Sequence, residues 1–163
     1  MENKAETAKR LFLSGANCSQ AVIGAFQPEC GIDFDTAMRI ASGFGGGMGR
    51  LREVCGAVSG MFMAAGLLRG SSDLRDKAAK DAHYALIQEL AEAFRRENGS
   101  IVCRELLGLG AAQADREFRA AAGCTEEIRV ADAGQGIVDR QAGMHSGSLV
   151  DNLQQVVEVG SGL

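Results

Sequence analysis

The chain has 163 residues and a formal net charge of −4, from 17 basic and 21 acidic side chains. Apolar residues make up 46% and charged residues 23%, which is typical of a globular protein with one buried core. This mildly acidic chain lacks the basic surface that binds nucleic acid or anionic membranes, so we expect neither partner. The unusual counts are 22 glycines, 5 cysteines and one proline.

Helical spacing of apolar residues recurs along most of the chain. The predicted helices cover, in order, about residues 2–14, 18–27, 36–41, 55–69, 73–97, 101–107 and 112–122, with a further turn from Cys124 to about 131. No stretch alternates β-branched and polar residues, so we expect no sheet. The sequence therefore predicts an all-α fold: a compact multi-helix single domain over residues 1–132, followed by a Gly-rich tail, 133–163, with a short helix capped by Ser148.

Caps and breakers set the expected helix limits. Asn17 is the expected cap of the second helix, and Pro28 and Gly31 are expected to break it. The third helix follows Asp33 or Asp35. Further along the chain, the longest helix is expected to follow Ser71 or Ser72 and to end at Gly99. Ser100 is then expected to start the next helix.

The cellular compartment decides whether the cysteines are expected to be reduced or to form disulfides. The N-terminus is charged and lacks the apolar stretch of a signal peptide, and the most apolar run, residues 57–68, is too short to span a bilayer. We therefore expect no membrane insertion and a cytoplasmic location. Thiols stay reduced there, so cysteines are more often metal ligands or redox centres than structural disulfides.

The five cysteines divide into four and one. No CxxC pair is present, which argues against zinc fingers and thioredoxin-type sites. Four lie on the apolar stripe in the first turn of a predicted helix, where backbone N–H groups and the helix dipole stabilise a thiolate. These four are Cys18, Cys55, Cys103 and Cys124. Cys30 lies in the expected Pro28–Gly31 turn and is interpreted as a small buried hydrophobe.

Three functions follow from this placement. The first is a metal centre ligated by the four cysteines, above all an iron–sulfur cluster for electron transfer. The second is metal-free thiol–disulfide exchange, with Cys55 as nucleophile and Cys18 as the other catalytic cysteine. The third is a non-catalytic helical oligomer or partner-binding module. The sequence identifies neither a redox partner nor an enzymatic activity. A homodimer is expected only because homodimers are the commonest oligomers of soluble proteins.

The loop GFGGGMGR, residues 43–50, precedes Cys55. It lacks the Lys-Ser/Thr pair of a nucleotide-binding P-loop, so close backbone approach is the better interpretation. Gly45, Gly46 and Gly47 are candidate cofactor-binding residues, because their N–H groups would reach the sulfurs. Arg50, with Arg52, would stabilise a thiolate or an anionic cluster; the alternative is two solvated arginines.

One histidine shares an apolar helix stripe. His83 lies among the apolar residues of the longest predicted helix, where we expect a hydrogen-bonded core histidine rather than a ligand or proton relay.

These motifs resemble one family. The hexapeptide CGAVSG, residues 55–60, matches the CGAxxG motif of the four-cysteine redox-active family designated C_GCAxxG_C_C. GANCSQAV around Cys18, ASGFGGGMGR, GSIVCRELLG around Cys103, and Cys124 with its downstream apolar residues also match, over about residues 5–132. The resemblance implies a redox role for Cys18, Cys55, Cys103 and Cys124 and leaves out Cys30. The tail beyond 132 does not resemble the family's usual end.

Overall fold

The computed structural model describes residues 3–109, and the helix at 112–122, the turn at Cys124 and the tail lie outside the described residues. The all-α prediction is confirmed. The elements are α1 (Lys4–Leu13), α2 (Cys18–Cys30), α3 (Phe34–Ala41), the 3-10 turn η1 (Ser42–Phe44), α4 (Gly45–Met48), α5 (Gly56–Arg69), α6 (Lys77–Asn98) and α7 (Cys103–Leu106). Between residues 3 and 109 the only β pairing is one antiparallel bridge, Val54 with Val102.

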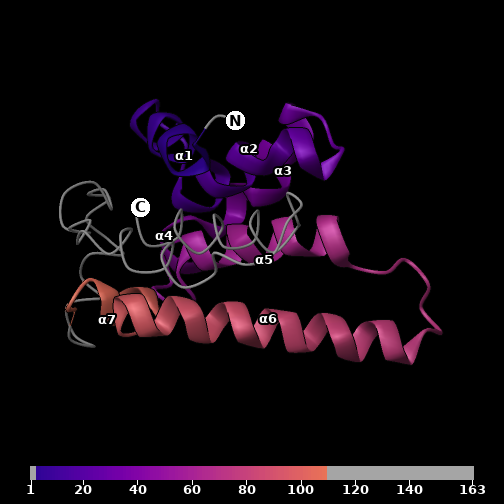
Figure 1. Ribbon diagram of the computed structural model, residues 1–163. Coiled ribbons are helices and arrows are strands. Elements are labelled where there is room, and N and C mark those ends of the chain that lie inside the picture. Colours follow the sequence, from indigo (N-terminus) through magenta and orange to yellow (C-terminus); the bar gives the residue numbers. More distant parts are fainter. Residues whose placement is uncertain (1–2, 110–163) are drawn as a thin grey trace.

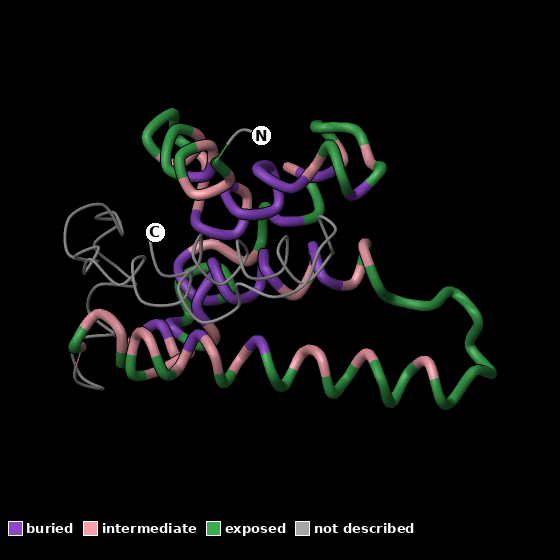
Figure 2. The backbone as a smooth tube through the Cα atoms, in the orientation of Figure 1, coloured by how far each residue is buried: buried purple, intermediate pink, exposed green. Residues whose placement is uncertain are grey.

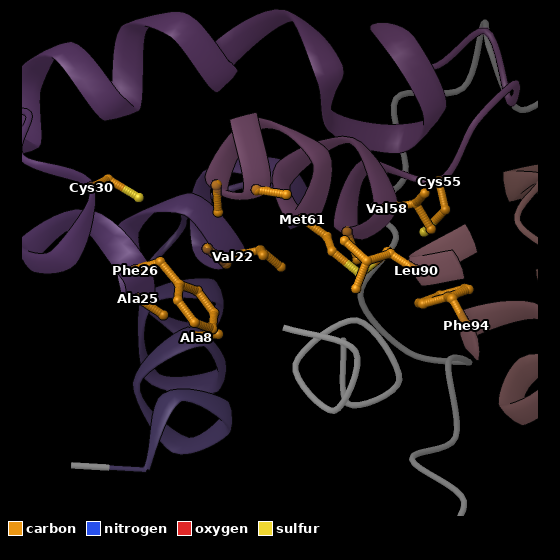
Figure 3. Packing of buried hydrophobic residues seen from close by; sticks show 14 residues of the cluster. Ala8, Val22, Ala25, Phe26, Cys30, Cys55, Val58, Met61, Leu90 and Phe94 are labelled. Carbon is orange, nitrogen blue, oxygen red and sulfur yellow. The ribbon is translucent and has the colours of Figure 1, made fainter. Parts of the chain in front are cut away.

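Helices α2 and α5 form the centre of the molecule. In Figure 1, α5 lies between α2 on one side and the long α6 on the other. Both central helices are buried along most of their length (Figure 2), because their sequences are small and apolar all round. Figure 3 shows Phe26, Met61 and Phe94 in this core, each at most 1% exposed. Burial of side chains this large contributes roughly 1.5–3 kcal/mol each.

Helix α6 is amphipathic and only partly covered by the described chain. Leu90 and Phe94 are its buried residues, and its first half carries only half-buried and exposed side chains (Figure 2). The end at Gly99 is confirmed: Gly99 has the left-handed φ of 85° that glycine tolerates. After α6 the chain enters the 99–109 segment, where Val102 pairs with Val54 just before α5 and α7 contacts α4 (Figure 1).

Two helix starts differ from prediction. The cap of α6 is Asp76, whose carboxylate accepts from the Ala79 N–H at 2.9 Å; Ser71 instead accepts from the Asp73 N–H in the preceding loop. The prediction of a serine cap is therefore wrong. Ser100 likewise does not start the next helix, because Val102 is extended and paired with Val54, and the helix begins only at Cys103.

Pro28 also behaves differently from the prediction. Helix α2 passes through it and ends three residues later at Gly31, which is left-handed. A proline in the last turn removes one intrahelical hydrogen bond, and the burial of α2 against its neighbours outweighs that loss. The third helix begins as expected after Asp33, whose carboxylate accepts from the Thr36 N–H at 2.9 Å.

Candidate functional site

Cys18 is the first residue of α2 and is 4% exposed. The Asn17 side chain accepts from the Gln20 N–H and the Gln20 side chain accepts from the Asn17 N–H, both at 3.0 Å. This capping box fixes where α2 begins. The predicted placement of Cys18, inward at the positive end of a helix, is confirmed.

Cys55 stands directly before α5 as its N-cap and is also 4% exposed. Its N–H donates to the Ile101 carbonyl at 2.8 Å, and its own carbonyl accepts from the Ser59 N–H at 2.9 Å. The backbone of Cys55 therefore joins two elements: it starts α5 and it continues the bridge to the 101–103 segment.

Cys103 is the first residue of α7 and is 5% exposed. Its N–H donates to the Glu53 carbonyl at 2.6 Å, next to the Val54–Val102 bridge. Cys55 and Cys103 each follow a bridged valine by one residue. Because side chains alternate along extended backbone, these two thiols fall on the same side of the paired segments.

The glycine loop before Cys55 forms a tight turn with an unusual backbone. Residues 46–50 have positive φ throughout: 63°, 71°, 60°, 62° and 70°; Arg52 follows at 62°. Three of these residues, Met48, Arg50 and Arg52, are not glycine. A left-handed conformation costs a non-glycine residue about 1–2 kcal/mol. Contacts with the surrounding structure must therefore compensate for this cost and hold the turn in place.

Those contacts come from residues that are distant in sequence. A Cβ atom on Gly45 would lie 2.5 Å from the Cβ of Asn17, beside Cys18, and one on Gly47 would lie 2.6 Å from the Cβ of Cys103. A Cβ on Gly56, the residue after Cys55, would lie 3.1 Å from the Cβ of Cys18. Glycine is required at these points because the neighbouring side chains and backbone approach too closely for a Cβ atom. Cys103 thus contacts the glycine turn directly, and Cys18 contacts Gly56, the residue after Cys55.

The two arginines of this loop have different environments. Arg50 is exposed, whereas Arg52 is 2% exposed and its Nη1 lies 3.6 Å from the Cβ position of Gly46. From the sequence, both arginines were expected to have the same role near Cys55. The structure distinguishes them by burial, and no local sequence signal predicts which of the two is buried.

Cys30 lies at the other end of α2 from Cys18, about 18 Å away at 1.5 Å per residue. Figure 3 shows Cys30 and Cys55 at opposite ends of the hydrophobic core. Burial raises the pKa of the Cys30 thiol to about 11; Glu29 adds to this effect and Lys4 opposes it. Cys30 is therefore a protonated core residue, apart from the other three.

Over residues 3–109, no disulfide joins one of the described cysteines to another, and no three His, Cys, Asp or Glu side chains are arranged to hold a metal ion. Cys124, the fourth predicted ligand, lies outside the described residues. His83 is half-buried on α6, and its Nδ1 has no hydrogen-bond partner in the described part of the chain, so the expected bond is not formed at that atom. None of the helices described is long and apolar enough to cross a membrane.

These features define a class: a small helical protein with thiols buried at helix N-termini, one of them against a glycine turn. The family model described as "Putative redox-active protein (C_GCAxxG_C_C)" matches residues 16–133, most of the chain. The chain belongs to this family, as its motifs predicted. The matched range includes Cys18, Cys55, Cys103 and Cys124. No curated protein and no solved structure matches the chain.

Proposed function

We propose that this redox-family protein carries a cysteine-ligated metal centre, an iron–sulfur cluster, with Cys18, Cys55, Cys103 and Cys124 as ligands. One observation carries the proposal: Cys18, Cys55 and Cys103 are buried at the starts of three helices, Cys103 against Gly47 of the glycine turn and Cys18 against Gly56, the residue after Cys55. Electron transfer to a redox partner is the proposed role, in the cytoplasm, where thiols stay reduced.

The donor set fits such a group. Thiolates are soft ligands, and iron–sulfur clusters commonly take four of them. No three His, Cys, Asp or Glu side chains within residues 3–109 are arranged to hold a metal ion, so the proposal requires Cys124 to join and the three described thiols to come closer when the group binds. The cluster, when bound, would accept and release single electrons.

The chain's own residues have three tasks in this proposal. The cysteines bind, and their near-complete burial excludes water from the sulfurs. Gly45, Gly46 and Gly47 allow backbone N–H groups to approach the sulfurs, which raises a cluster's potential. Arg50, at the exposed side of the same turn, would place positive charge toward an approaching partner.

Anaerobic purification tests the proposal directly. The expected result is a brown protein containing iron and acid-labile sulfide, with visible charge-transfer absorption. Serine at Cys18, Cys55, Cys103 or Cys124 should each remove most of the metal, whereas Cys30→Ser, the matched control, should retain it. A colourless wild-type protein without iron or zinc after reconstitution would contradict the metal centre.

Thiol–disulfide exchange is the second candidate, favoured by the close approach of Cys18 to Gly56, beside Cys55. The Cys55 thiolate would attack a partner disulfide and form a mixed disulfide. Cys18, after losing its proton, would then attack the Cys55 sulfur and release the partner as a dithiol. The chain's two thiols lose two electrons and two protons, which the partner disulfide gains.

A redox titration separates the two candidates. Alkylation and mass measurement should show a Cys18–Cys55 disulfide forming in metal-free protein between about −150 and −350 mV. If no pair changes state in that range, exchange is excluded. If alanine replacement of all four cysteines leaves folding and oligomeric state unchanged and removes no redox activity, the result would instead support a helical binding module.

A further inference from the structure

Large side chains are exposed on the outer side of the glycine turn. Leu51 is 61% exposed, Met48 is 38% exposed, and Arg50, which lies between them in sequence, is exposed as well. Exposed apolar side chains beside an arginine are typical of protein interfaces, where Met and Arg are both enriched. We call Met48, Arg50 and Leu51 the turn edge.

The turn edge is held in a backbone conformation that its side chains disfavour. Met48 and Arg50 have φ values of 60° and 70°, which glycine adopts without strain. Each non-glycine residue in this conformation costs about 1–2 kcal/mol. Backbone strain of this kind is concentrated at functional sites. Glycine at both positions would make the turn less strained, so these two side chains have a task beyond connecting α3 to α5.

Backbone hydrogen bonds fix the turn edge in place. The Arg50 N–H donates to the Gly45 carbonyl at 3.1 Å. The Leu51 N–H donates to the Met48 carbonyl at 3.2 Å. The stem of Arg50 also lies against the turn, because its Cγ is 3.0 Å from the Cβ position of Gly46. A surface that is ordered before binding loses little conformational entropy when a partner docks.

The turn edge carries a positive charge that its surroundings do not neutralise. Arg50 is exposed, and no carboxylate within residues 3–109 pairs with it. By contrast, Arg39 pairs with Asp35 at 3.6 Å, and Arg104 of α7 pairs with Glu53 at 2.8 Å. The exposed charge of the turn edge therefore complements an acidic surface on another molecule.

The turn edge lies next to one of the buried cysteines. Gly47, the chain neighbour of Met48, is buried, and a Cβ atom on it would lie 2.6 Å from the Cβ of Cys103. Cys18, Cys55 and Cys103 are themselves at most 5% exposed, so a partner protein must dock on residues that cover them. The turn edge is one such cover, two residues along the contact from Cys103.

We propose that the turn edge is the docking surface for an acidic redox-partner protein, with Met48 and Leu51 at the apolar centre of the contact and Arg50 as its charged anchor. The inference rests on the proposed function, since it needs the cysteine centre to exchange electrons with a partner. Opposite charge speeds the encounter, and desolvated apolar side chains stabilise the docked complex. Because the whole chain has a net charge of −4, the positive turn edge also orients an acidic partner.

The test measures electron transfer from a reduced, acidic plant-type ferredoxin to the oxidised centre by stopped-flow absorbance. The ferredoxin cluster loses one electron and the centre gains it. Wild-type transfer should be fast at low salt and should slow as salt rises, because screening weakens the attraction. Arg50→Glu should slow transfer about tenfold or more at low salt.

Arg75→Glu is the matched control for the charge change. Arg75 is exposed in the loop before α6, at the end of α6 opposite α7 (Figure 1), so its reversal should leave the rate close to wild type. Arg50→Gly separates docking from folding, because glycine adopts the φ of 70° without strain while the charge is lost. Its turn should keep its backbone and its transfer should still be slow. Leu51→Ser should slow transfer at low and high salt alike, since its contribution is apolar.

Reduction through small mediators, which need no docking surface, shows whether each variant keeps its centre. The docking surface is overturned if the Arg50 and Leu51 variants transfer electrons at the wild-type rate, or if Arg75→Glu is slowed as much as Arg50→Glu. It is also overturned if the wild-type rate rises with salt, or if the ferredoxin does not react while mediators still reduce the centre. Each of these results leaves the redox proposal standing. A wild-type protein that no mediator reduces overturns both.

Discussion

Gly47 and Cys103 are in such close contact that a Cβ atom on Gly47 would lie 2.6 Å from the Cβ of Cys103. The same atom would lie 2.9 Å from the Glu53 nitrogen, and the φ of Gly47 is 71°. Space and conformation therefore both demand glycine. The turn and α7 approach closely at this residue, so the position of Cys103 depends on it.

Gly47→Ala should disrupt the cysteine site. The left-handed conformation alone costs alanine about 1–2 kcal/mol, and relief of the contact must displace Cys103 or the backbone of Glu53. We expect a loss of about 2 kcal/mol or more in unfolding free energy by denaturant titration, with loss of redox-centre absorbance. Gly43→Ala is the control, because no atom lies within 4 Å of its Cβ position. An equal effect of both substitutions would refute the argument.

Gly60 and Gly66 of α5 should respond to alanine in opposite directions. A Cβ on Gly60 would lie 2.7 Å from the Ser19 carbonyl oxygen of α2, whereas the nearest atom to that of Gly66 is His83 Nε2 at 4.0 Å. Gly60→Ala forces α2 and α5 apart and should cost about 1–3 kcal/mol. Gly66→Ala should stabilise by about 0.5–1 kcal/mol through helix propensity. Thermal and denaturant unfolding measure both; two changes of the same sign would contradict the packing.

Cys30 should make stability depend on alkaline pH. Burial raises its pKa from 9.0 to about 11, so the folded chain keeps the proton that the unfolded chain loses first. Its contribution is complete below about pH 9 and is lost as pH rises through about 11. The stability difference between wild type and Cys30→Ala should therefore be constant up to about pH 9 and shift against the wild type by pH 11. Denaturant midpoints at pH 7, 9 and 11 measure it. A constant difference throughout would show that Cys30 titrates normally.

The helices were largely predictable because their signals are local. Apolar spacing located α2 and α5, and Asn17 and Asp33 are the caps that the sequence indicated. The expected inward placement of Cys18 and Cys103 at helix starts is confirmed for the same reason. A cap and an apolar stripe are both properties of a few neighbouring residues.

The geometry of the site was not predictable in this way. The glycine loop was expected to approach something closely, yet its consecutive positive φ values depend on contacts with Asn17 and Cys103, which are distant in sequence. The burial of Arg52 and exposure of Arg50 depend on the same turn. These backbone angles and burial differences are determined by packing between residues that are distant in sequence. Local sequence patterns therefore do not predict them.

Asn17 connects helix capping to the cysteine site. Besides capping α2, its Nδ2 donates to the Ser42 carbonyl at 3.1 Å, and its Cβ is the atom nearest to the Cβ position of Gly45. Asn17→Ala should therefore remove about 1 kcal/mol of cap energy and also release the turn beside Cys18. We expect a lower unfolding midpoint together with reduced metal content or a shifted reduction midpoint.

Asn3→Ala is the matched control for this prediction. Asn3 caps α1 through its Oδ1, which accepts from the Ala5 N–H at 2.9 Å, and it lies on a helix that carries none of the cysteines. A comparable loss of cap energy should leave the redox centre unchanged. Asn17→Asp adds a second comparison, since aspartate retains the cap but cannot donate to Ser42. If Asn17→Asp alters the centre as strongly as Asn17→Ala, the bond to Ser42 matters; if only Asn17→Ala does, the cap matters. No effect on the centre from either would separate Asn17 from the site.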